Sequence, residues 1–201
     1  MLKNKVVKKY SNFEVREYDS SLVAEALVSG DKRQASNDGF RLIARYIFGH
    51  NNSKGNSRDA AEKGESVAMT APVEIQRLPS EKVAMTAPVE IQESSNNKAA
   101  SYLVRFTMPS KYTLENLPVP RDSRVKIRLR ESAVYAARKY SGFWSDSSDR
   151  KQKRLLIEGL QKHGYTYKNS FVFARYNSPW TPWFLRHNEV LVELEGNQKG
   201  K

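Results

Sequence analysis

Hydrophobic and polar residues alternate along several short segments of the chain, which is the spacing of a β-strand with one buried face. Residues with turn chemistry, such as Asp19–Ser21 and Gly142, separate these segments. The pattern predicts strands at residues 13–18, 22–28, 102–108, 124–130, 133–140, 171–176 and 188–194. The connectors are short, so we expect most neighbouring strands to run antiparallel.

Two longer stretches have a helical period instead. Phe40, Ile43 and Ile47 recur three or four residues apart, and Leu155, Leu156, Ile157 and Leu160 do so later in the chain. Polar residues that cap helices precede both stretches, and a glycine follows each. The first predicted helix runs from caps at residues 36–38 to Gly49, and the second from caps at residues 145–149 to Gly164.

One ten-residue segment occurs twice without change. The sequence VAMTAPVEIQ fills residues 67–76 and returns, sixteen residues later, at residues 83–92. Each copy alternates like a strand, and its proline removes one backbone donor, which favours a sheet edge or a bulge. One strand position needs only one copy. The other copy either pairs with it as a hairpin or is looped out, and the sequence leaves open which copy enters the sheet.

With this strand included, the order strand, strand, helix, strand, strand occurs twice, in residues 13–108 and in residues 124–194. The order predicts an α+β fold in which two half-sheets, each carrying a helix, share one core. Residues 1–201 then form a single domain with two pseudo-repeats and a frayed tail at 195–201. The 201 residues are enough for one such core without a disulfide or a metal.

Composition excludes several classes of protein. The chain has no cysteine, which rules out a disulfide scaffold, a thiolate metal site and a cysteine nucleophile. No apolar run approaches the roughly 18 residues of a membrane span. The N-terminal nine residues are basic but lack an apolar core, so no secretory signal is expected. Both observations fit a cytoplasmic protein.

The charge balance is 34 basic against 22 acidic residues, a formal net charge of +12. Such a charge attracts polyanions, anionic lipids or anionic small molecules, or serves solubility alone. Arg124, Lys126, Arg128 and Arg130 alternate along one segment. Without interleaved aromatic residues they indicate a solvated sheet face rather than a nucleic-acid surface. Glutamates 14 and 25 are likewise expected on solvated strand faces.

Signatures of catalysis are missing from the sequence. There is no phosphate-binding glycine loop, serine nucleophile elbow or paired-histidine zinc motif. The three histidines are dispersed, and no carboxylate pair is spaced for acid–base work. We therefore expect a binding protein rather than an enzyme.

The first predicted helix offers a binding chemistry. It interleaves the cations Arg41 and Arg45 with large apolar side chains, namely Phe40, Ile43, Tyr46, Ile47 and Phe48. A flat, apolar dianion such as a tetrapyrrole needs an apolar wall and cations for its carboxylates. The alternative is an amphipathic helix that packs on its sheet and leaves the arginines solvated.

Several segments, in this order, resemble the SOUL/HEBP family of haem-binding proteins. They are FEVREY at residues 13–18, GFRLIARYIFG at 39–49, VAMTAPV in both copies, ARYNSPWT at 174–181 and RHNEV at 186–190. The resemblance covers nearly the whole chain. It implies a distorted antiparallel β-barrel of two pseudo-repeats flanked by two helices, and reversible binding of haem or metal-free porphyrin.

The resemblance also implies a site, a shallow apolar groove with a basic rim beside the first helix. By motif, its residues here are Arg41, Ile43, Arg45, Tyr46, Phe48, Met69 and Met85. Lys54 adds a further cation for the ligand's carboxylates. Some members carry a histidine in the segment that reads Arg16–Tyr18 here, and this chain has none there. His50, just past the helix, is then the nearby candidate for a metal ligand.

Three functions follow from these observations. The first is a tetrapyrrole carrier or buffer without catalytic activity. The second is a ligand-sensing or protein-interaction module, because duplicated halves of this kind also resemble the effector-binding domains of transcription regulators. The third is an enzyme acting on a tetrapyrrole, for which the sequence names no acid or base.

Overall fold

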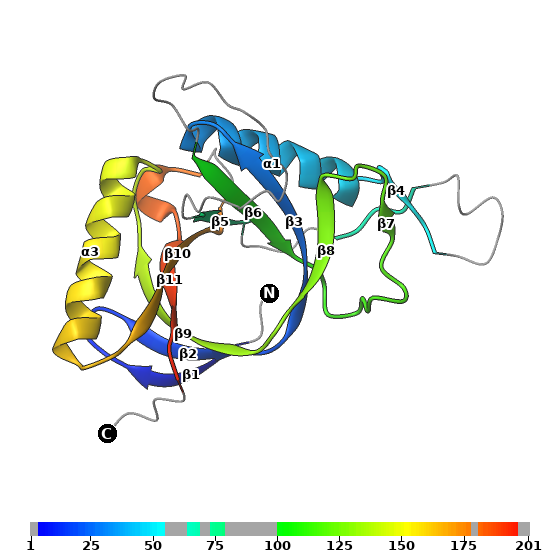
Figure 1. The fold of residues 1–201 in the computed structure, drawn as a ribbon. Helices are drawn as coiled ribbons and strands as arrows, with labels where there is room; N and C mark the ends of the chain where they lie inside the picture. The colour runs from blue at the N-terminus through cyan, green and yellow to red at the C-terminus, as the bar shows by residue number, and fades with distance from the viewer. Residues whose placement is uncertain (1–3, 55–63, 69–72, 79–99, 178–180, 197–201) are drawn as a thin grey trace, which may run out of the picture.

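The computed structural model of the chain describes residues 4–54, 64–68, 73–78, 100–177 and 181–196 (Figure 1). Nine of its strands form one antiparallel sheet in the order β1-β2-β9-β11-β10-β5-β6-β3-β8, and β4 pairs with β7. The elements are β1 (Asn4–Lys9), β2 (Glu14–Tyr18), β3 (Ser21–Ser29), α1 (Lys32–Ile47), β4 (Asn51–Asn52), β5 (Val73–Arg77), β6 (Ser101–Thr107), β7 (Val119–Pro120), β8 (Val125–Arg130), β9 (Ala133–Tyr140), α3 (Asp146–Lys162), β10 (Tyr167–Arg175), the short 3₁₀ helix η1 (Trp183–Leu185) and β11 (Asn188–Leu194).

The large sheet curls into a half-barrel, with α1 and α3 packed against its outer side (Figure 1). Within the described residues β1 and β8 are the two edges of this sheet, so the expected barrel is an open one. The predicted strands are all found, within a few residues of their expected ends. β1 was not predicted, because its run of lysines and valines carries no clear alternation.

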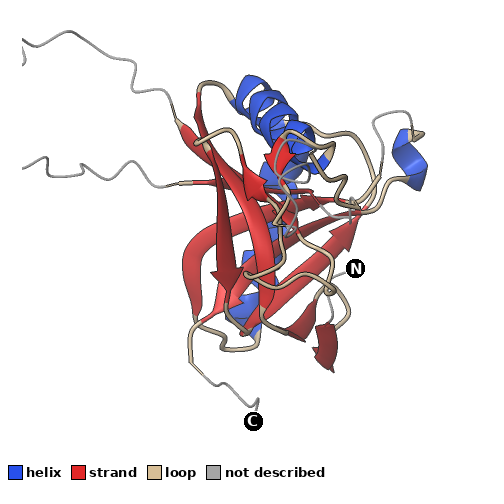
Figure 2. Ribbon diagram, turned by 90° about the vertical axis from the view of Figure 1, so that its right-hand side faces the viewer, coloured by secondary structure: helices blue, strands red, loops and turns tan. Residues whose placement is uncertain are grey.

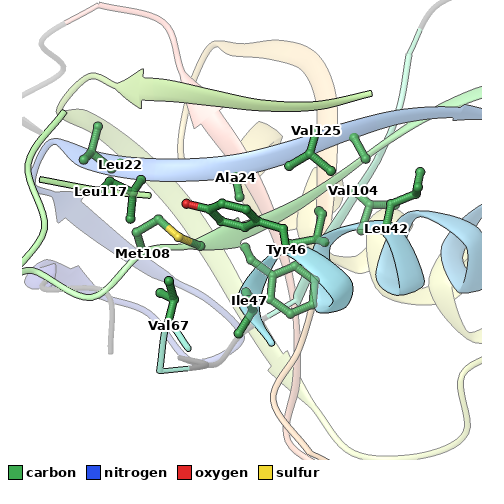
Figure 3. Packing of buried hydrophobic residues seen from close by; sticks show 13 residues of the cluster. Leu22, Ala24, Leu42, Tyr46, Ile47, Val67, Val104, Met108, Leu117 and Val125 are labelled. Atoms are coloured by element: carbon green, nitrogen blue, oxygen red, sulfur yellow. The ribbon is translucent and has the colours of Figure 1, made fainter. Parts of the chain in front are cut away.

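Each helix covers its own apolar cluster on the outer side of the sheet. Beneath α1, Tyr46 and Ile47 pack against strand residues such as Val104 and Val125 (Figure 3). Beneath α3, Leu156 and Leu160 pack against Phe13 and other residues of the neighbouring strands. Two helices on two patches of one sheet therefore hold the half-barrel in shape.

α1 begins earlier than the sequence predicts. Its N-cap is Asp31, whose carboxylate accepts hydrogen bonds from the backbone N–H groups of Arg33 and Gln34 at 2.9 and 3.0 Å. The expected caps at residues 36–38 lie inside the helix instead. The first turn of the helix is polar and has no apolar residues at helical spacing, so the sequence pattern did not indicate this start. Asp31 stabilises it by capping the helix.

α3 begins and ends where the sequence predicts. The Ser145 hydroxyl caps it by accepting from the Ser148 N–H at 3.2 Å, and Gly164 follows it with a φ of 70°. The predicted stop of α1 is also confirmed, since Gly49 follows it with a φ of 102°. Both glycines adopt the left-handed backbone that ends many helices.

The first copy of the repeated segment supplies a strand of the sheet. Val73–Arg77 forms β5, which lies between β10 and β6 near the centre of the sheet. Pro72 and the second copy, residues 83–92, lie outside the described residues. The expected hairpin or looped-out arrangement of that copy therefore stays a prediction.

The basic stripe of β8 is solvated as predicted at Arg124, Lys126 and Arg128, which are exposed, but not at Arg130. Arg130 donates to both oxygens of the Glu74 carboxylate at 2.9 and 3.0 Å, and the Arg128 guanidinium lies 3.5 Å from the Glu25 carboxylate. Glu25 also accepts from Arg105 at 3.0 Å. The two partners of Glu25 lie on the strands next to β3, whereas Arg130 reaches Glu74 across β3 and β6, a contact that the pattern of a single strand could not predict.

Candidate functional site

The structure divides the predicted site residues of α1 between two faces of the helix. Ile43 and Tyr46 point into the core, and the Tyr46 hydroxyl donates to the Pro118 carbonyl at 2.9 Å. Arg41, Arg45 and Phe48 are exposed on the opposite side. The buried pair therefore positions the helix, whereas the exposed residues are available to a ligand.

The exposed side of α1 carries an apolar stripe beside a basic one. Phe40 and Phe48 are 40% and 67% exposed, and eight residues of helix place them about 80° apart around the axis. The Phe40 ring also packs on Phe106, with 5.6 Å between centroids. Arg41 and Arg45 lie four residues apart on the neighbouring line of the same helix. Among the described residues, neither arginine side chain has an ion pair or a hydrogen bond with another residue. The surface thus presents apolar area together with two cations that form no salt bridge, of which Arg45 also attracts the Asp122 carboxylate.

The chain segment before β5 docks at the C-terminal end of this surface. Phe48 forms an isolated β-bridge with Ser66, and the Val67 N–H donates to the Ile47 carbonyl at 2.8 Å. Val67 is buried, and Ala68 after it is exposed. Met69 and Met85, the two methionines predicted for the site, lie outside the described residues.

His50 lies directly after α1 and is half-buried. Its backbone N–H donates to the Arg45 carbonyl at 2.8 Å, and its carbonyl accepts from Arg121 at 3.5 Å. Its imidazole makes no hydrogen bond with another described residue. In the described part of the chain, no three histidine, cysteine or acidic side chains gather as a metal site would require. The assignment of His50 as a metal ligand therefore stays a prediction.

A comparison with known protein families matches residues 2–193 to the SOUL heme-binding protein family. The chain belongs to the SOUL haem-binding family. Among curated proteins, Heme-binding protein 1 of Xenopus laevis is 26% identical over 184 residues, which cover 88% of this chain and 84% of that protein. The protein of the same name from Xenopus tropicalis is 24% identical over the same shares.

Solved structures share the fold of this SOUL-family chain at low identity. The EcmrR C-terminal domain matches with a TM-score of 0.59 and 10% identity, over 90% of this chain and 95% of the other. A hydrolase from Listeria innocua matches with a TM-score of 0.57 and 12% identity, over 91% of each chain. SAV2435 bound to tetraphenylphosphonium matches with a TM-score of 0.50 and 12% identity, over 92% and 95%. At these identities the likeness concerns the fold alone.

The inner face of the half-barrel holds a buried ion pair that sequence reasoning missed. Arg16 and Glu189 are 4% and 1% exposed, and the guanidinium donates to both carboxylate oxygens at 3.1 and 3.0 Å. Burial pushes the pKa of Glu189 up, but hydrogen bonds from Arg16 and Tyr176 outweigh it and hold that pKa below its usual value. The same burial raises the pKa of the adjacent Tyr18 to about 12.

The sequence contained one signal for this pair. Arg16 stands at an inner-face strand position next to buried Val15, and Glu189 lies in the family segment RHNEV, 173 residues away. A charged residue within an apolar alternation indicates a buried partner, although it does not identify that partner. The expectation that Glu14 is solvated was also wrong, because the Arg16 guanidinium lies 2.8 Å from its carboxylate.

A second buried carboxylate joins the beginnings of the two helices. Asp149 of α3 accepts from Arg175 at 2.9 and 2.7 Å, from Tyr140 at 2.8 Å and from Lys32 of α1. Burial acts to raise the pKa of Asp149, but the positive charge of Arg175 outweighs it and lowers that pKa. Both buried acids are therefore ionised and fully engaged with cations.

The described residues of the loop before β11 expose large apolar side chains. Its short helix η1 projects from the body of the molecule (Figure 2). Trp183, Phe184 and Leu185 are exposed, and the Phe143 ring stacks on Trp183 with 5.4 Å between centroids.

None of the helices in the described ranges is both long and apolar enough to cross a lipid bilayer.

Proposed function

We propose that this SOUL-family chain reversibly binds haem or metal-free porphyrin on the exposed side of α1, as a carrier or buffer without catalytic activity. The observation that carries the proposal is the apolar stripe of Phe40 and Phe48 beside the unpaired cations Arg41 and Arg45. Membership in the family and likeness to Heme-binding protein 1 support it.

The chemistry of the surface fits a tetrapyrrole. The macrocycle is flat and apolar, so its contact with the phenylalanines removes apolar area from water. Its two carboxylates would form charge-assisted hydrogen bonds with Arg41 and Arg45. Lys54 is exposed beyond the end of α1, although its ammonium donates to the Leu114 carbonyl and would have to exchange that bond for a ligand carboxylate.

The remaining predicted residues take distinct places in this proposal. Ile43 and Tyr46 hold the helix from behind, and the ligand does not touch them. Met69 follows the docked segment of the first copy and would extend the apolar wall, whereas Met85 is its equivalent in the second copy. His50 would hold the iron when the ligand is haem. A bound haem would supply an iron centre, and a metal-free porphyrin would be held by the other contacts alone.

A binding role also agrees with the buried acids. Glu189, Asp149 and Glu74 are each paired with an arginine, so none of the three is free to act as a general acid or base. The Listeria innocua neighbour called a hydrolase shares only the fold.

A second candidate function is a ligand-sensing or protein-interaction module. The likeness to SAV2435 bound to tetraphenylphosphonium favours it, because that name pairs this fold with a bound small molecule. Stoichiometric capture of a partner protein without any tetrapyrrole would support this second role.

We further propose that the chain is one cytoplasmic domain formed by duplication. From the centre of the sheet outward, one half has the order β5-β6-β3-β8, and the other has the order β10-β11-β9-β2. Each of these eight strands thus has a counterpart at the equivalent place in the other half, which supports two pseudo-repeats, and β1 is an additional edge strand. The complete lack of cysteine in the sequence agrees with a reducing compartment.

Titration of the purified chain with hemin and with protoporphyrin IX tests the main proposal. We expect a shifted Soret band and quenched tryptophan fluorescence that saturate at one ligand per chain. Binding of both ligands fits a surface that recognises the macrocycle and its carboxylates. Binding of neither would contradict the proposal and favour the interaction module.

A further inference from the structure

A groove with a volume of about 610 Å³ opens between the β2–β3 turn and the loop that follows β6. None of its lining residues belongs to α1, so it is separate from the proposed tetrapyrrole surface. Its volume lies in the range of about 300–1,000 Å³ that is usual for small-molecule sites. Every residue that lines it lies in the described part of the chain.

The groove has an apolar floor and two exposed apolar walls. Leu22 and Met108 form the floor, and both belong to the buried cluster under α1 (Figure 3). Leu114 from the loop and Leu129 from the edge strand β8 also line it, yet they are 50% and 56% exposed. Two half-exposed leucines facing one hollow leave apolar area that a ligand with an apolar body would cover.

The charged residues of this lining are both acidic. They are Asp19 of the β2–β3 turn and Glu115 of the loop, whereas the whole chain has an excess of basic residues. A hydrogen bond from Thr113 lowers the pKa of Glu115, and Lys54 contributes a weaker attraction. The Lys54 ammonium itself donates to the Leu114 carbonyl and is not part of the lining. The Lys111 ammonium lies 4.9 Å from the ring centroid of Tyr112, another lining residue, so the lining itself is negative and the two lysines lie at its border.

We propose that this groove binds a small amphiphilic organic cation, an amine or quaternary ammonium on an aliphatic or aromatic body. The apolar body would lie on Leu22 and Met108 between the two exposed leucines, and the cationic group would face Asp19 and Glu115. Hydroxyl groups of the lining, such as that of Ser20, can accept hydrogen bonds from an ammonium. An anion of the same shape would be repelled.

Three probes of one shape and different charge test this assignment: 4-phenylbutylamine, 4-phenylbutanol and 4-phenylbutyrate. Calorimetry and NMR shift mapping on the full chain should show that the amine binds at least about fivefold more tightly than the alcohol, and that the anion is weakest. Asp19→Asn and Glu115→Gln should each lower the affinity for the amine and leave the affinity for the alcohol unchanged. Leu129→Arg should lower the affinity for both compounds.

Glu17→Gln is the matched control, because Glu17 is an exposed carboxylate of β2 outside the groove. It should bind the amine like the unaltered chain. Binding of the anion as tightly as the amine would overturn the proposal. So would binding of none of the probes, or an amine affinity unaffected by both acid variants. Hemin titrations of the same variants should be unchanged, so this proposal and the tetrapyrrole proposal succeed or fail separately.

Discussion

Arg41 and Arg45 lie one helical turn apart on the exposed side of α1, and in the ranges that the structure describes neither guanidinium forms a salt bridge or a side-chain hydrogen bond. Arg16, Arg130 and Arg175 are placed differently, since each is bonded to a buried carboxylate. The charge of Arg45 does reach Asp122, whose pKa falls to about 2 chiefly through its hydrogen bond with Arg124. The two cations of α1 therefore remain available to a ligand anion.

The exposed ring of Phe48 should matter for binding and not for folding. Phe48→Ser removes apolar contact with the ligand, and we expect the affinity for protoporphyrin IX to fall about fivefold or more. The unfolding free energy should change by less than about 0.5 kcal/mol, because the side chain is 67% exposed. Leu27→Ser is the control, as Leu27 is 57% exposed on β3 and should leave both quantities unchanged. Equal losses in both variants would argue against a site on α1.

His50 separates haem binding from porphyrin binding. If the imidazole holds the iron, His50→Ala lowers the affinity for hemin by about tenfold or more and shifts the Soret maximum of the complex. Protoporphyrin IX has no metal, so its affinity should be unchanged. An identical hemin spectrum and affinity in the variant would show that the imidazole is not a ligand.

The Arg16–Glu189 pair predicts a large loss of stability when one partner is removed. Arg16→Met leaves the Glu189 carboxylate, which is 1% exposed, without its main partner. Removing one partner of a buried ion pair lowers the free energy of unfolding by about 3–5 kcal/mol. Chemical denaturation measures this loss. Arg16→Met combined with Glu189→Met should recover part of it, because the pair is then replaced by apolar side chains.

The same pair sets a dependence on pH. Because the pKa of Glu189 is lowered in the folded chain, its stabilisation is complete above the unfolded pKa of about 4.3 and is lost as the pH falls through the folded value. Glu189→Gln should flatten the decline of stability below about pH 4.3 relative to the unaltered chain. An equally steep decline would contradict this assignment.

Gly39 fixes how closely α1 approaches the sheet. A Cβ atom there would lie 2.5 Å from a methyl carbon of Val104, so Gly39→Ala should destabilise the chain by about 1–3 kcal/mol despite the better helix propensity of alanine. Val104→Ala in the same chain removes the obstructing methyl groups. The double variant should therefore lose less than the sum of the two single losses in thermal or denaturant unfolding. Simple additivity would mean that the contact does not limit the packing.

Much of this architecture could be predicted from local patterns. Alternation located most strands, and Ser145 with Gly164 located both ends of α3, because those signals lie within a few residues of the feature. The true start of α1 was missed, since Asp31 caps a polar turn with no apolar period. The ion pairs of the inner face were missed because sheet curvature creates them, and Arg16 and Glu189 are far apart in the chain.

For the proposed site, the sequence predicted the helix but not which of its sides faces outward. Phe40, Ile43, Tyr46 and Phe48 are all large and apolar, and only packing against the sheet decides that Ile43 and Tyr46 are buried. The broad apolar arc of α1 made both orientations plausible. The groove beside Leu129 had no sequence signal, because its walls come from three separate parts of the chain.

The account rests most directly on the contact between the arginines of α1 and the ligand's carboxylates. The decisive measurement compares protoporphyrin IX with its dimethyl ester on the unaltered chain and on Arg41→Glu/Arg45→Glu, with Arg33→Glu as a control from the exposed first turn of the same helix. Arg41→Glu/Arg45→Glu should lower the affinity for the free acid by about tenfold or more and leave the affinity for the ester unchanged. The Arg33→Glu control should bind both compounds like the unaltered chain. Equal weakening of acid and ester, or no weakening of the acid, would contradict the proposed site.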